Sequence, residues 1–287
     1  LMFAWAERDW IRDLDAALLD GRVDLVVHSA KDLPDKLPPG IDGCWLPWRE
    51  DRRDALVAPA GKSLADLPPD PRIGVSSGRR EAYCRARFPQ AVLLSIRGNV
   101  DERIRQLDEG RFDLIVTAVA ALDRLGLAGR ISDCIPLHEL PTPDGQGVLA
   151  VTFRADDSRM LRLRSLLIRP VVFVGAGVGS PRNCTLAGIE ALREAEVCLH
   201  DALLDPALLD FLPGVARRID VGKRCEKHGC TQAGILDLLV EYACRGLRVV
   251  RLKGGDPGIF GRLAEETDTL ASRRIPFRVL PGISSLN

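Results

Sequence analysis

Apolar and polar positions alternate along this chain with two periods, one typical of helices and one typical of buried strands. Residues 10–19 carry apolar side chains at helical spacing, and Gly21 follows as a stop. The same spacing predicts helices at residues 185–196 and 231–242. Short runs rich in β-branched residues predict strands at 23–27, 171–174, 197–201, 249–250 and 277–280. Strands that alternate with helices in this way indicate an α/β fold.

Polar residues follow two of these predicted strands at the point where the chain must turn. His28, Ser29, Lys31 and Asp32 come after the strand at 23–27. Ligands usually bind at the carboxyl ends of strands in α/β sheets, which makes this a candidate site. For any one of these residues, a plain helix cap or turn is the simpler explanation.

Glycines follow the strands at 171–174 and 249–250. Gly254, Gly255, Asp256 and Pro257 favour a tight turn, and two glycines without Cβ atoms let a backbone approach a ligand closely. The loop GAGVGS at 175–180 suggests a dinucleotide loop, but Pro181 interrupts the helix start that such a loop requires. Either loop by itself is weak evidence for a ligand.

Composition narrows the class of protein. A chain of 287 residues with 46% hydrophobic and 28% charged residues has ordinary globular composition and length for about two domains. The 40 basic and 40 acidic side chains cancel, so no overall charge draws the protein to nucleic acid. No apolar run approaches the roughly 18 residues of a membrane helix. We expect neither nucleic acid nor membrane as a partner.

The eight cysteines are scattered, which favours reduced thiols and a cytoplasmic location over a disulfide framework. Cys225, His228 and Cys230 lie close in sequence, but they lack a fourth ligand and the paired spacing of a zinc site. We therefore expect no metal. The chain begins at Leu1 and stops just after the predicted strand at 277–280, so we expect a fragment of a longer protein.

The second half carries a long motif string. GGDPGIFGR at residues 254–262 resembles the signature of uroporphyrinogen-III C-methyltransferases, in the tetrapyrrole methylase family. GAGVGSP at 175–181 and PGISS at 281–285 are similar to two further segments of that family. The resemblance implies that this half binds S-adenosylmethionine. The implied cofactor contacts are Gly175, Gly177, Val178, Gly254, Gly255, Asp256, Ile259, Ser284 and Ser285.

The same resemblance implies two catalytic residues. It places a general base at Asp201, after the strand at 197–201, and an acid at Lys223 in VGKR. Methylation at carbon requires proton management, because a pyrrole carbon attacks the methyl group and a proton must later leave. A helix cap or a surface charge remains the alternative explanation for either residue.

The first half carries five motifs in order. VHSAKD at 27–32, GVSSGRR at 74–80, IRGNVDER at 96–103, DLIVTAVAALDRLG at 113–126 and PTPDGQG at 141–147 resemble segments of hydroxymethylbilane synthase (porphobilinogen deaminase). The resemblance implies a two-lobed fold of the periplasmic-binding-protein kind. It also implies Asp32 as the catalytic carboxylate, which accepts pyrrole N–H groups and stabilises the cation formed when ammonia leaves.

Linear pyrroles carry acetate and propionate arms, so a site that binds them needs fixed cations. The guanidinium group of arginine suits this role because it can form two parallel hydrogen bonds to one carboxylate. Cations around Asp32 are expected to keep it ionised. A solvated surface is the alternative for these arginines, and a nucleic-acid stripe is less favoured because aromatic residues do not interleave them. The candidate substrate-binding residues are Ser29, Lys31, Ser76, Ser77, Arg79, Arg80, Arg97, Asn99, Arg103, Arg124 and Gln146.

The resemblance also implies a dipyrromethane cofactor, which the deaminase family attaches to a cysteine through a thioether. None of the eight cysteines lies in a matching loop, so we expect the anchoring cysteine to be absent. Without that anchor the first half is expected not to turn over as it stands.

We therefore predict a fusion for tetrapyrrole biosynthesis. Residues 1–165 form the deaminase-like region, with lobe one at 1–47 plus 142–160 and lobe two at 53–141, and residues 170–287 form the N-terminal α/β lobe of a methylase that converts uroporphyrinogen III toward precorrin-2. The resemblance leaves room for a homodimer through the methylase part. The main alternative is a non-catalytic module or degenerate partner that binds pyrrole carboxylates; an enzyme that uses nicotinamide ranks third.

Overall fold

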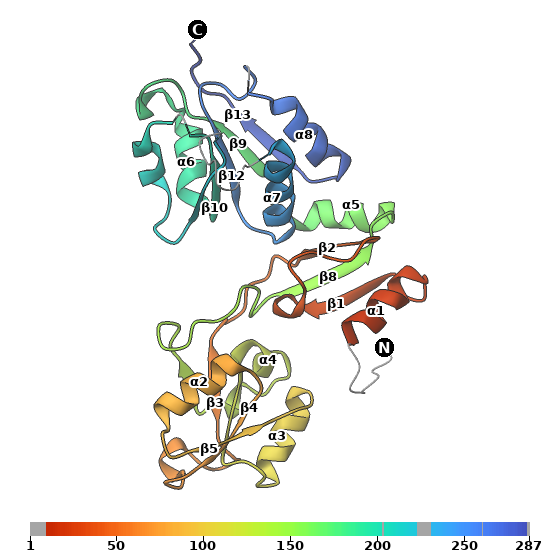
Figure 1. Cartoon of the computed structure of the whole chain (residues 1–287), viewed down its shortest axis with the longest axis vertical. Coiled ribbons are helices and arrows are strands. Elements are labelled where there is room, and N and C mark those ends of the chain that lie inside the picture. The colour runs from red at the N-terminus through yellow and green to blue at the C-terminus, as the bar shows by residue number, and fades with distance from the viewer. Residues whose placement is uncertain (1–9, 203, 223–230, 260, 286–287) are drawn as a thin grey trace. The chain divides into compact units, whose positions relative to one another are not determined.

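The computed structural model describes residues 10–202, 204–222, 231–259 and 261–285, and within them the fold is mixed α/β (Figure 1). The contacts divide the chain into two compact units. One comprises residues 1–27, 35–47 and 150–287, and the other comprises 28–34 and 48–149. The two-lobed arrangement of the periplasmic-binding-protein kind, with its lobe limits, stays a prediction.

A parallel five-stranded sheet is the centre of the first unit. Its order is β11-β10-β12-β9-β13, and neighbouring strands run parallel to one another. The strand predicted at 249–250 continues to Lys253, because the alternating charged residues beyond Val250 are buried rather than exposed. The strands are β9 (Val171–Gly175), β10 (Val197–His200), β11 (Arg217–Asp220), β12 (Val249–Lys253) and β13 (Phe277–Leu280).

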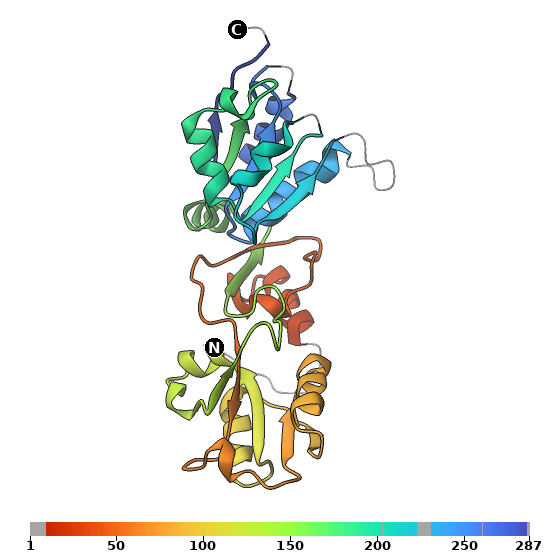
Figure 2. The ribbon, with the colours of Figure 1, turned by 90° about the vertical axis from the view of Figure 1, so that its left-hand side faces the viewer.

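Helices cover both faces of this sheet (Figure 2). Val171 and Phe173 of β9 pack into one core with residues of α7 and α8, while Val172 and Val174 pack into a second core with residues of α6. A strand with both faces buried is expected in a parallel sheet. The helices are α6 (Leu186–Glu194), α7 (Gln232–Cys244) and α8 (Leu263–Ser272). Thr185 and Thr231, the first residues of the helices predicted at 185–196 and 231–242, are the N-caps of α6 and α7.

A smaller sheet belongs to the same unit. Its order is β1-β8-β2, and β2 pairs antiparallel with β8. Cys44 of β2 and Val151 of β8 lie in the same core cluster as β9, α7 and α8, so the two sheets share apolar packing. The elements are α1 (Trp10–Leu19), β1 (Leu25–Ser29), β2 (Ile41–Trp45), β8 (Leu149–Arg154) and α5 (Ser158–Leu167).

Arg164 of α5 is the polar residue of this shared core, with a side chain only 1% exposed. Its guanidinium pairs with Asp42 of β2 at 2.6 Å and lies 5.9 Å from the ring centre of Phe153. It also donates a hydrogen bond to the main-chain oxygen of Arg273, just after α8. One buried cation therefore joins the small sheet to the end of α8.

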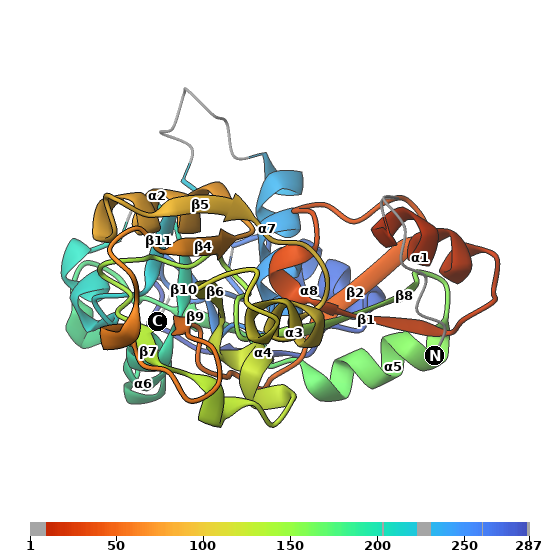
Figure 3. The ribbon, with the colours of Figure 1, turned by 90° about the horizontal axis from the view of Figure 1, so that it is seen from below.

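The second unit contains another five-stranded sheet, in the order β5-β4-β6-β3-β7. β3 runs antiparallel to its neighbours β6 and β7, and β4 runs parallel to β5 and β6. One core packs this sheet against α2 and a second packs it against α3 and α4 (Figure 3). The elements are β3 (Asp54–Val57), β4 (Arg72–Val75), α2 (Gly78–Arg87), β5 (Val92–Ser95), α3 (Val100–Asp108), β6 (Leu114–Ala118), α4 (Val119–Arg124) and β7 (Asp133–Ile135). Five 3-10 turns complete the described elements: η1 (Ala30–Asp32), η2 (Leu64–Asp66), η3 (Ala128–Arg130), η4 (Pro181–Asn183) and η5 (Pro206–Phe211).

One local expectation needs correction. The strand predicted at 23–27 begins at Leu25 and runs to Ser29, because Gly21 to Asp24 complete the turn after α1. Arg124, a candidate substrate-binding residue, is the last residue of α4.

The six cysteines that the structure describes are free thiols. Burial raises the pKa of Cys44 and Cys198 to about 12 and that of Cys84 and Cys244 to about 11. These side chains therefore stay protonated and behave as small apolar groups. Among the described residues, none of the helices combines the length and the apolar character that crossing a bilayer would need.

Replacing Arg164 by Met is expected to lower the free energy of unfolding by about 3 kcal/mol, because Asp42 loses its buried partner. Urea unfolding followed by tryptophan fluorescence measures this change. Arg162→Met, on the exposed side of the same helix, serves as the control and should unfold near the wild-type midpoint. Equal midpoints for the two variants would contradict a structural role for the Arg164 pair.

Candidate functional site

A cavity of about 360 Å³ opens at the carboxyl ends of β9 and β12, which are neighbours in the parallel sheet. Its wall contains eight of the nine residues predicted to contact a cofactor. The ninth, Gly175, ends β9 directly beside the cavity segment that starts at Ala176. The lining residues are Ala176, Gly177, Val178, Gly179, Ser180, Leu204, Asp205, Leu208, Gly254, Gly255, Asp256, Ile259, Ser284 and Ser285.

Glycine is required where the segments of this wall meet. Gly177 and Gly255 exchange two main-chain hydrogen bonds of 3.2 and 3.0 Å, and both have positive φ. A Cβ on Gly175 would lie 2.4 Å from the main-chain nitrogen of Gly282. No side chain fits between these segments, so the glycines set the shape of the cavity.

Asp256 joins two segments of the cavity wall. Its carboxylate accepts hydrogen bonds from the main-chain N–H of Gly258 at 2.8 Å and of Gly282 at 3.1 Å. The side chain therefore fixes its own turn and ties that turn to the segment that carries Ser284 and Ser285. Asp256 and Asp205 are the acidic groups of the described lining, and no basic side chain is among those residues.

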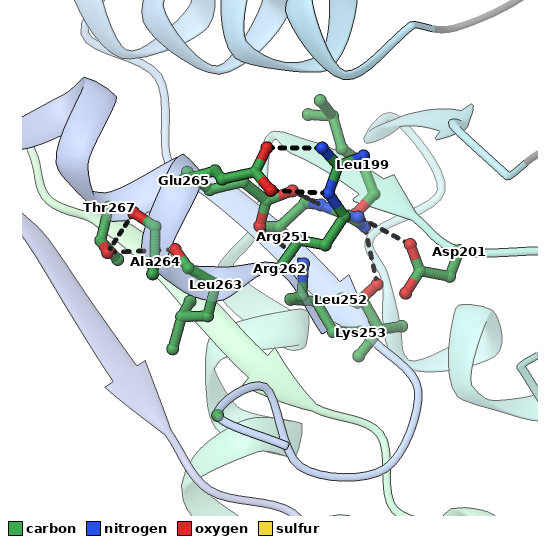
Figure 4. Close-up of polar contacts among 12 residues, drawn as sticks. Leu199, Asp201, Arg251, Leu252, Lys253, Arg262, Leu263, Ala264, Glu265 and Thr267 are labelled. Carbon is green, nitrogen blue, oxygen red and sulfur yellow. Dashed lines mark hydrogen bonds and ion pairs between the residues drawn. The ribbon is translucent and has the colours of Figure 1, made fainter. Parts of the chain in front are cut away.

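Asp201, the predicted base, lies just beyond β10 with both carboxylate oxygens engaged. One oxygen is 2.6 Å from Nη2 of Arg251 (Figure 4). The other accepts a 3.3 Å hydrogen bond from the N–H of Gly254. The side chain thus reaches the cavity wall through Gly254. Lys223, the predicted acid, lies outside the described residues, as do Cys225, His228 and Cys230.

The second unit gathers cations around a fully buried carboxylate, Asp54, at the start of β3. Arg79 and Arg80 of α2 donate to its two oxygens at 2.6 and 2.7 Å. The amide of Gln146 donates to the same carboxylate at 2.9 Å. Burial alone would raise the pKa of Asp54, but hydrogen bonds and charge from Arg80 and Arg79 outweigh it and lower the pKa.

Further predicted residues join this cluster. Nζ of Lys31 donates to Gln146 at 3.2 Å. The hydroxyl of Ser76 accepts hydrogen bonds from Arg80 and Arg103, each at 3.1 Å. The structure therefore brings together side chains from the VHSAKD, GVSSGRR, IRGNVDER and GQG segments, as their order in the chain alone could not show.

Two guanidinium atoms of the cluster have unused hydrogen-bonding capacity. Nη1 of Arg79 and Nε of Arg80 are buried and find no acceptor among the described residues. A buried donor without a partner is costly, so this arrangement is suited to an anionic ligand that supplies the missing oxygens. The residues present therefore fit a molecule that carries carboxylates.

Burial changes the charge behaviour of Asp32 and Lys31. Burial raises the pKa of Asp32, while the charges of Lys31, Arg80 and Arg103 oppose the rise. The sequence argument counted the cations and left out desolvation, which is the larger effect here. Burial and the neighbouring Arg80 lower the pKa of Lys31.

The remaining predicted residues lie at helix ends or on the surface. Ser77 and Asn99 are the N-caps of α2 and α3, and Asn99 accepts from the N–H of Glu102 at 2.7 Å. Arg124 pairs with Glu50 at 2.6 Å rather than with the cluster. Ser29 is half-buried at the end of β1, and Arg97 is exposed.

The sequence analysis missed Asp54, Arg251 and Glu266, and each had a signal. Asp54 opens an otherwise apolar strand in which all four residues are buried. Arg251 alternates with Lys253 in a strand whose five residues are all buried. Glu266 falls at helical spacing between Leu263 and Leu270, on the apolar side of α8. Leu204, Asp205 and Leu208 of the cavity carried no comparable signal.

Two family models match the chain in succession. Porphobilinogen deaminase, dipyromethane cofactor binding domain, matches residues 6–162, and Tetrapyrrole (Corrin/Porphyrin) Methylases matches residues 170–287. The porphobilinogen deaminase of Roseiflexus sp. (strain RS-1) is 50% identical over 154 residues, which are 54% of this chain and 51% of that protein. The porphobilinogen deaminase of Syntrophobacter fumaroxidans is 35% identical over 211 residues, 74% of this chain and 67% of that protein.

Among solved structures, uroporphyrin-III-C-methyltransferase from Thermus thermophilus is similar with 40% identity and a TM-score of 0.36, and the match covers 40% of this chain and 48% of that one. A structure of the Thermus thermophilus enzyme complexed with S-adenyl homocysteine matches with 39% identity and a TM-score of 0.34, over 41% of this chain and 46% of that one. The chain spans about half the length of the first curated relatives that it matches.

Replacing Asp54 by Asn is expected to lower the free energy of unfolding by about 3 kcal/mol at pH 7, because two guanidinium groups lose their buried counter-charge. The folded-state pKa of Asp54 is lowered, so its contribution is fully present above the unfolded pKa of about 3.9 and is lost as pH falls through the folded value. Urea unfolding measured between pH 3 and pH 7 should show the two proteins converge toward the acid end.

Asp51→Asn is the matched control for this series, because Asp51 forms a partly exposed pair with Arg53. An exposed pair contributes at most about 1 kcal/mol. A difference between wild type and Asp54→Asn that stays constant down to pH 3 would contradict the ionised state assigned to Asp54.

Proposed function

We propose that this chain serves tetrapyrrole biosynthesis through two separate sites. The chain belongs to the porphobilinogen deaminase family over residues 6–162 and continues as a tetrapyrrole methylase domain over residues 170–287. The methylase site would transfer a methyl group from S-adenosylmethionine to carbon atoms of uroporphyrinogen III, toward precorrin-2. The deaminase-like site would bind pyrrole carboxylates. A cytoplasmic location and a homodimer through the methylase part belong to the same proposal.

The cavity at the ends of β9 and β12 is the observation that supports the methylase proposal best. Three segments predicted separately from the sequence, at 175–180, 254–259 and 284–285, line one hollow. Its volume of about 360 Å³ falls in the range of pockets that bury a small ligand. We infer that Gly177, Gly255 and Asp256 would hold S-adenosylmethionine there.

The charge of the cavity wall favours the same ligand. The donor carries a sulfonium cation, and the described lining residues include two carboxylates and no basic group. A dinucleotide would instead bring a pyrophosphate, which two carboxylates repel. The proposal of an enzyme that uses nicotinamide therefore has less support than a methyl transfer.

In this reaction the chain's own residues would orient the donor and the substrate and remove a proton from the methylated substrate. When bound, the donor supplies an electrophilic methyl group. A substrate pyrrole carbon forms the new C–C bond as the S–C bond breaks toward sulfur, and a proton must then leave the resulting cation from another atom of the conjugated ring system. We propose Asp201 as the group that takes it, because its carboxylate is bound to Gly254 in the cavity wall. Lys223 stays a proposal as the acid.

The support for pyrrole binding in the second unit is the unused capacity of Arg79 and Arg80, beside Lys31 and Arg103. Carboxylate arms of a linear pyrrole would accept from Nη1 of Arg79 and Nε of Arg80. Asp32, whose pKa is raised by burial against the opposing charges of Lys31, Arg80 and Arg103, would accept the pyrrole N–H groups when ionised. Because the family model that matches is named for dipyromethane cofactor binding, we infer that this cluster would hold that cofactor.

The absence of an anchoring cysteine remains part of the proposal. On this view the deaminase-like region of the present chain captures pyrrole carboxylates without polymerising them. The cluster by itself supports binding equally well in a non-catalytic module, which is the second candidate function. The two differ in whether a dipyrrole becomes covalently attached.

S-adenosylhomocysteine is expected to raise the melting temperature of the full chain. At one hundred times its Kd, a ligand that binds only the folded state adds about 2.7 kcal/mol. Asp256→Ala should abolish the shift, because the turn and the segment at 282–285 lose their common acceptor. Asp268→Ala, an exposed change on α8, is the control. Stabilisation by NADH in place of S-adenosylhomocysteine would refute the methylase proposal.

Porphobilinogen is expected to bind the full chain by calorimetry and to lose most of its affinity in Arg80→Met. Arg87→Met, at the exposed end of the same helix, should bind as wild type does. After incubation, the denatured protein should give no colour with an acidic aldehyde reagent for dipyrroles. Colour that stays with the protein would show a covalent dipyrrole and overturn the proposed absence of turnover.

A further inference from the structure

Four charged side chains form a network at the carboxyl end of β12, next to residues that line the methylase cavity; Figure 4 labels three of them, Arg251, Lys253 and Asp201. Arg251 and Lys253 are alternate residues of β12, so they point to the same face of the sheet. They are 3% and 2% exposed, and Glu266 of α8 is fully buried. Asp201 completes the group. Cations at this depth are very costly unless carboxylates compensate them.

Glu266 is the residue that compensates both cations. Its Oε1 accepts from Nε of Arg251 at 3.1 Å, and its Oε2 accepts from Nζ of Lys253 at 2.6 Å. The other nitrogens of Arg251 are also engaged: Nη1 donates to main-chain oxygens, and Nη2 donates to Asp201. Arg251 therefore has no donor nitrogen left without a partner, unlike the arginines of the second unit.

The network reaches the cavity at both walls. Asp201, held by Arg251, accepts from the N–H of Gly254, which lines the cavity. The main-chain oxygen of Lys253 accepts from the N–H of Ala176, in the opposite segment of the lining. The Lys253 side chain also runs beneath Gly261, where an added Cβ would lie 2.9 Å from its Cε. A shift of Arg251 or Lys253 would thus move the segments that form the cavity.

We propose that Glu266 is a positioning residue for the donor cavity: it is not among the described lining residues, yet it sets Arg251 and Lys253 and, through them, Gly254 and Ala176. In this arrangement Asp201 supports the wall of the cavity in addition to any proton transfer. The inference rests on the proposed function, in that the cavity is taken to bind the methyl donor and its product. Its failure can be told from a failure of that function, because the wild-type protein is measured first.

The experiment is calorimetric titration of the full chain with S-adenosylhomocysteine. If wild type does not bind, the proposed function fails. If it binds, Glu266→Gln should raise Kd about tenfold or more. Glu265→Gln is the matched control, since its neighbouring carboxylate is exposed and pairs with Arg262. We expect that control to bind within about twofold of wild type, a change of under 0.5 kcal/mol. Equal Kd values for wild type and Glu266→Gln would refute the inference alone.

A pH series separates positioning from a plain loss of folding. Three charged groups surround Lys253: Arg251 on the same strand, Glu266 on α8 and Asp201 just beyond β10. Burial and the charge of Arg251 lower the pKa of Lys253, while Glu266 and Asp201 raise it and so oppose this shift. Without the Glu266 charge that pKa falls further. The folded variant then binds fewer protons than the unfolded chain, so its stability rises with pH. Because the Lys253 pKa is lowered further in the variant than in wild type, the affinity of Glu266→Gln should approach that of wild type as pH rises from 7 to 9.

A charge-balanced double variant provides the second test. Lys253→Met with Glu266→Gln removes one cation and one anion, which leaves Arg251 paired with Asp201. We expect the double variant to bind S-adenosylhomocysteine more tightly than Glu266→Gln does. If it binds no better, and raising the pH restores nothing, the charge argument is wrong. If neither variant folds, as judged by circular dichroism, Glu266 supports the fold as a whole and the positioning role is overturned.

Discussion

Compensation of buried cations is the constraint on which both candidate sites depend. In the second unit Asp54 is fully buried and holds Arg79 and Arg80, and in the methylase sheet Glu266 is fully buried and holds Arg251 and Lys253. One carboxylate thus serves two cations in each place. Removing a charge from such a group leaves its partner desolvated and unpaired, which costs far more than loss of a surface pair. The elements that carry these residues are therefore fixed relative to one another.

In both clusters one buried carboxylate pairs with two cations, but the clusters differ in whether the arginine nitrogens are all paired. Around Asp54, buried nitrogens of Arg79 and Arg80 are left without acceptors, so the cluster is prepared for an incoming anion. Around Glu266, every nitrogen of Arg251 already has a partner within the protein. An arginine in the first state still has donors to offer a ligand, and an arginine in the second state has all its donors satisfied within the protein. Free donor capacity, rather than charge alone, distinguishes the two uses.

Close contact between backbones is the second constraint at the methylase cavity. Gly175, Gly255 and Gly282 approach so closely that a Cβ on Gly175 or Gly282 would overlap main-chain atoms. These glycines therefore allow the segments at the cavity to meet without a clash. The acidic lining then gives the cavity a preference for a cation.

The sequence by itself determined the α/β class, the order of two family regions and the segments that line each site, because periodicity and contiguous motifs are local properties of a chain. It identified GGDPGIFGR and GVSSGRR without any knowledge of their surroundings. Only the tertiary structure decided that Asp54 pairs with two arginines and that Glu266 pairs with both Arg251 and Lys253. It also decided that burial outweighs nearby cations at Asp32. Pairing and desolvation depend on residues far apart in sequence, and no local pattern contains the distances between them.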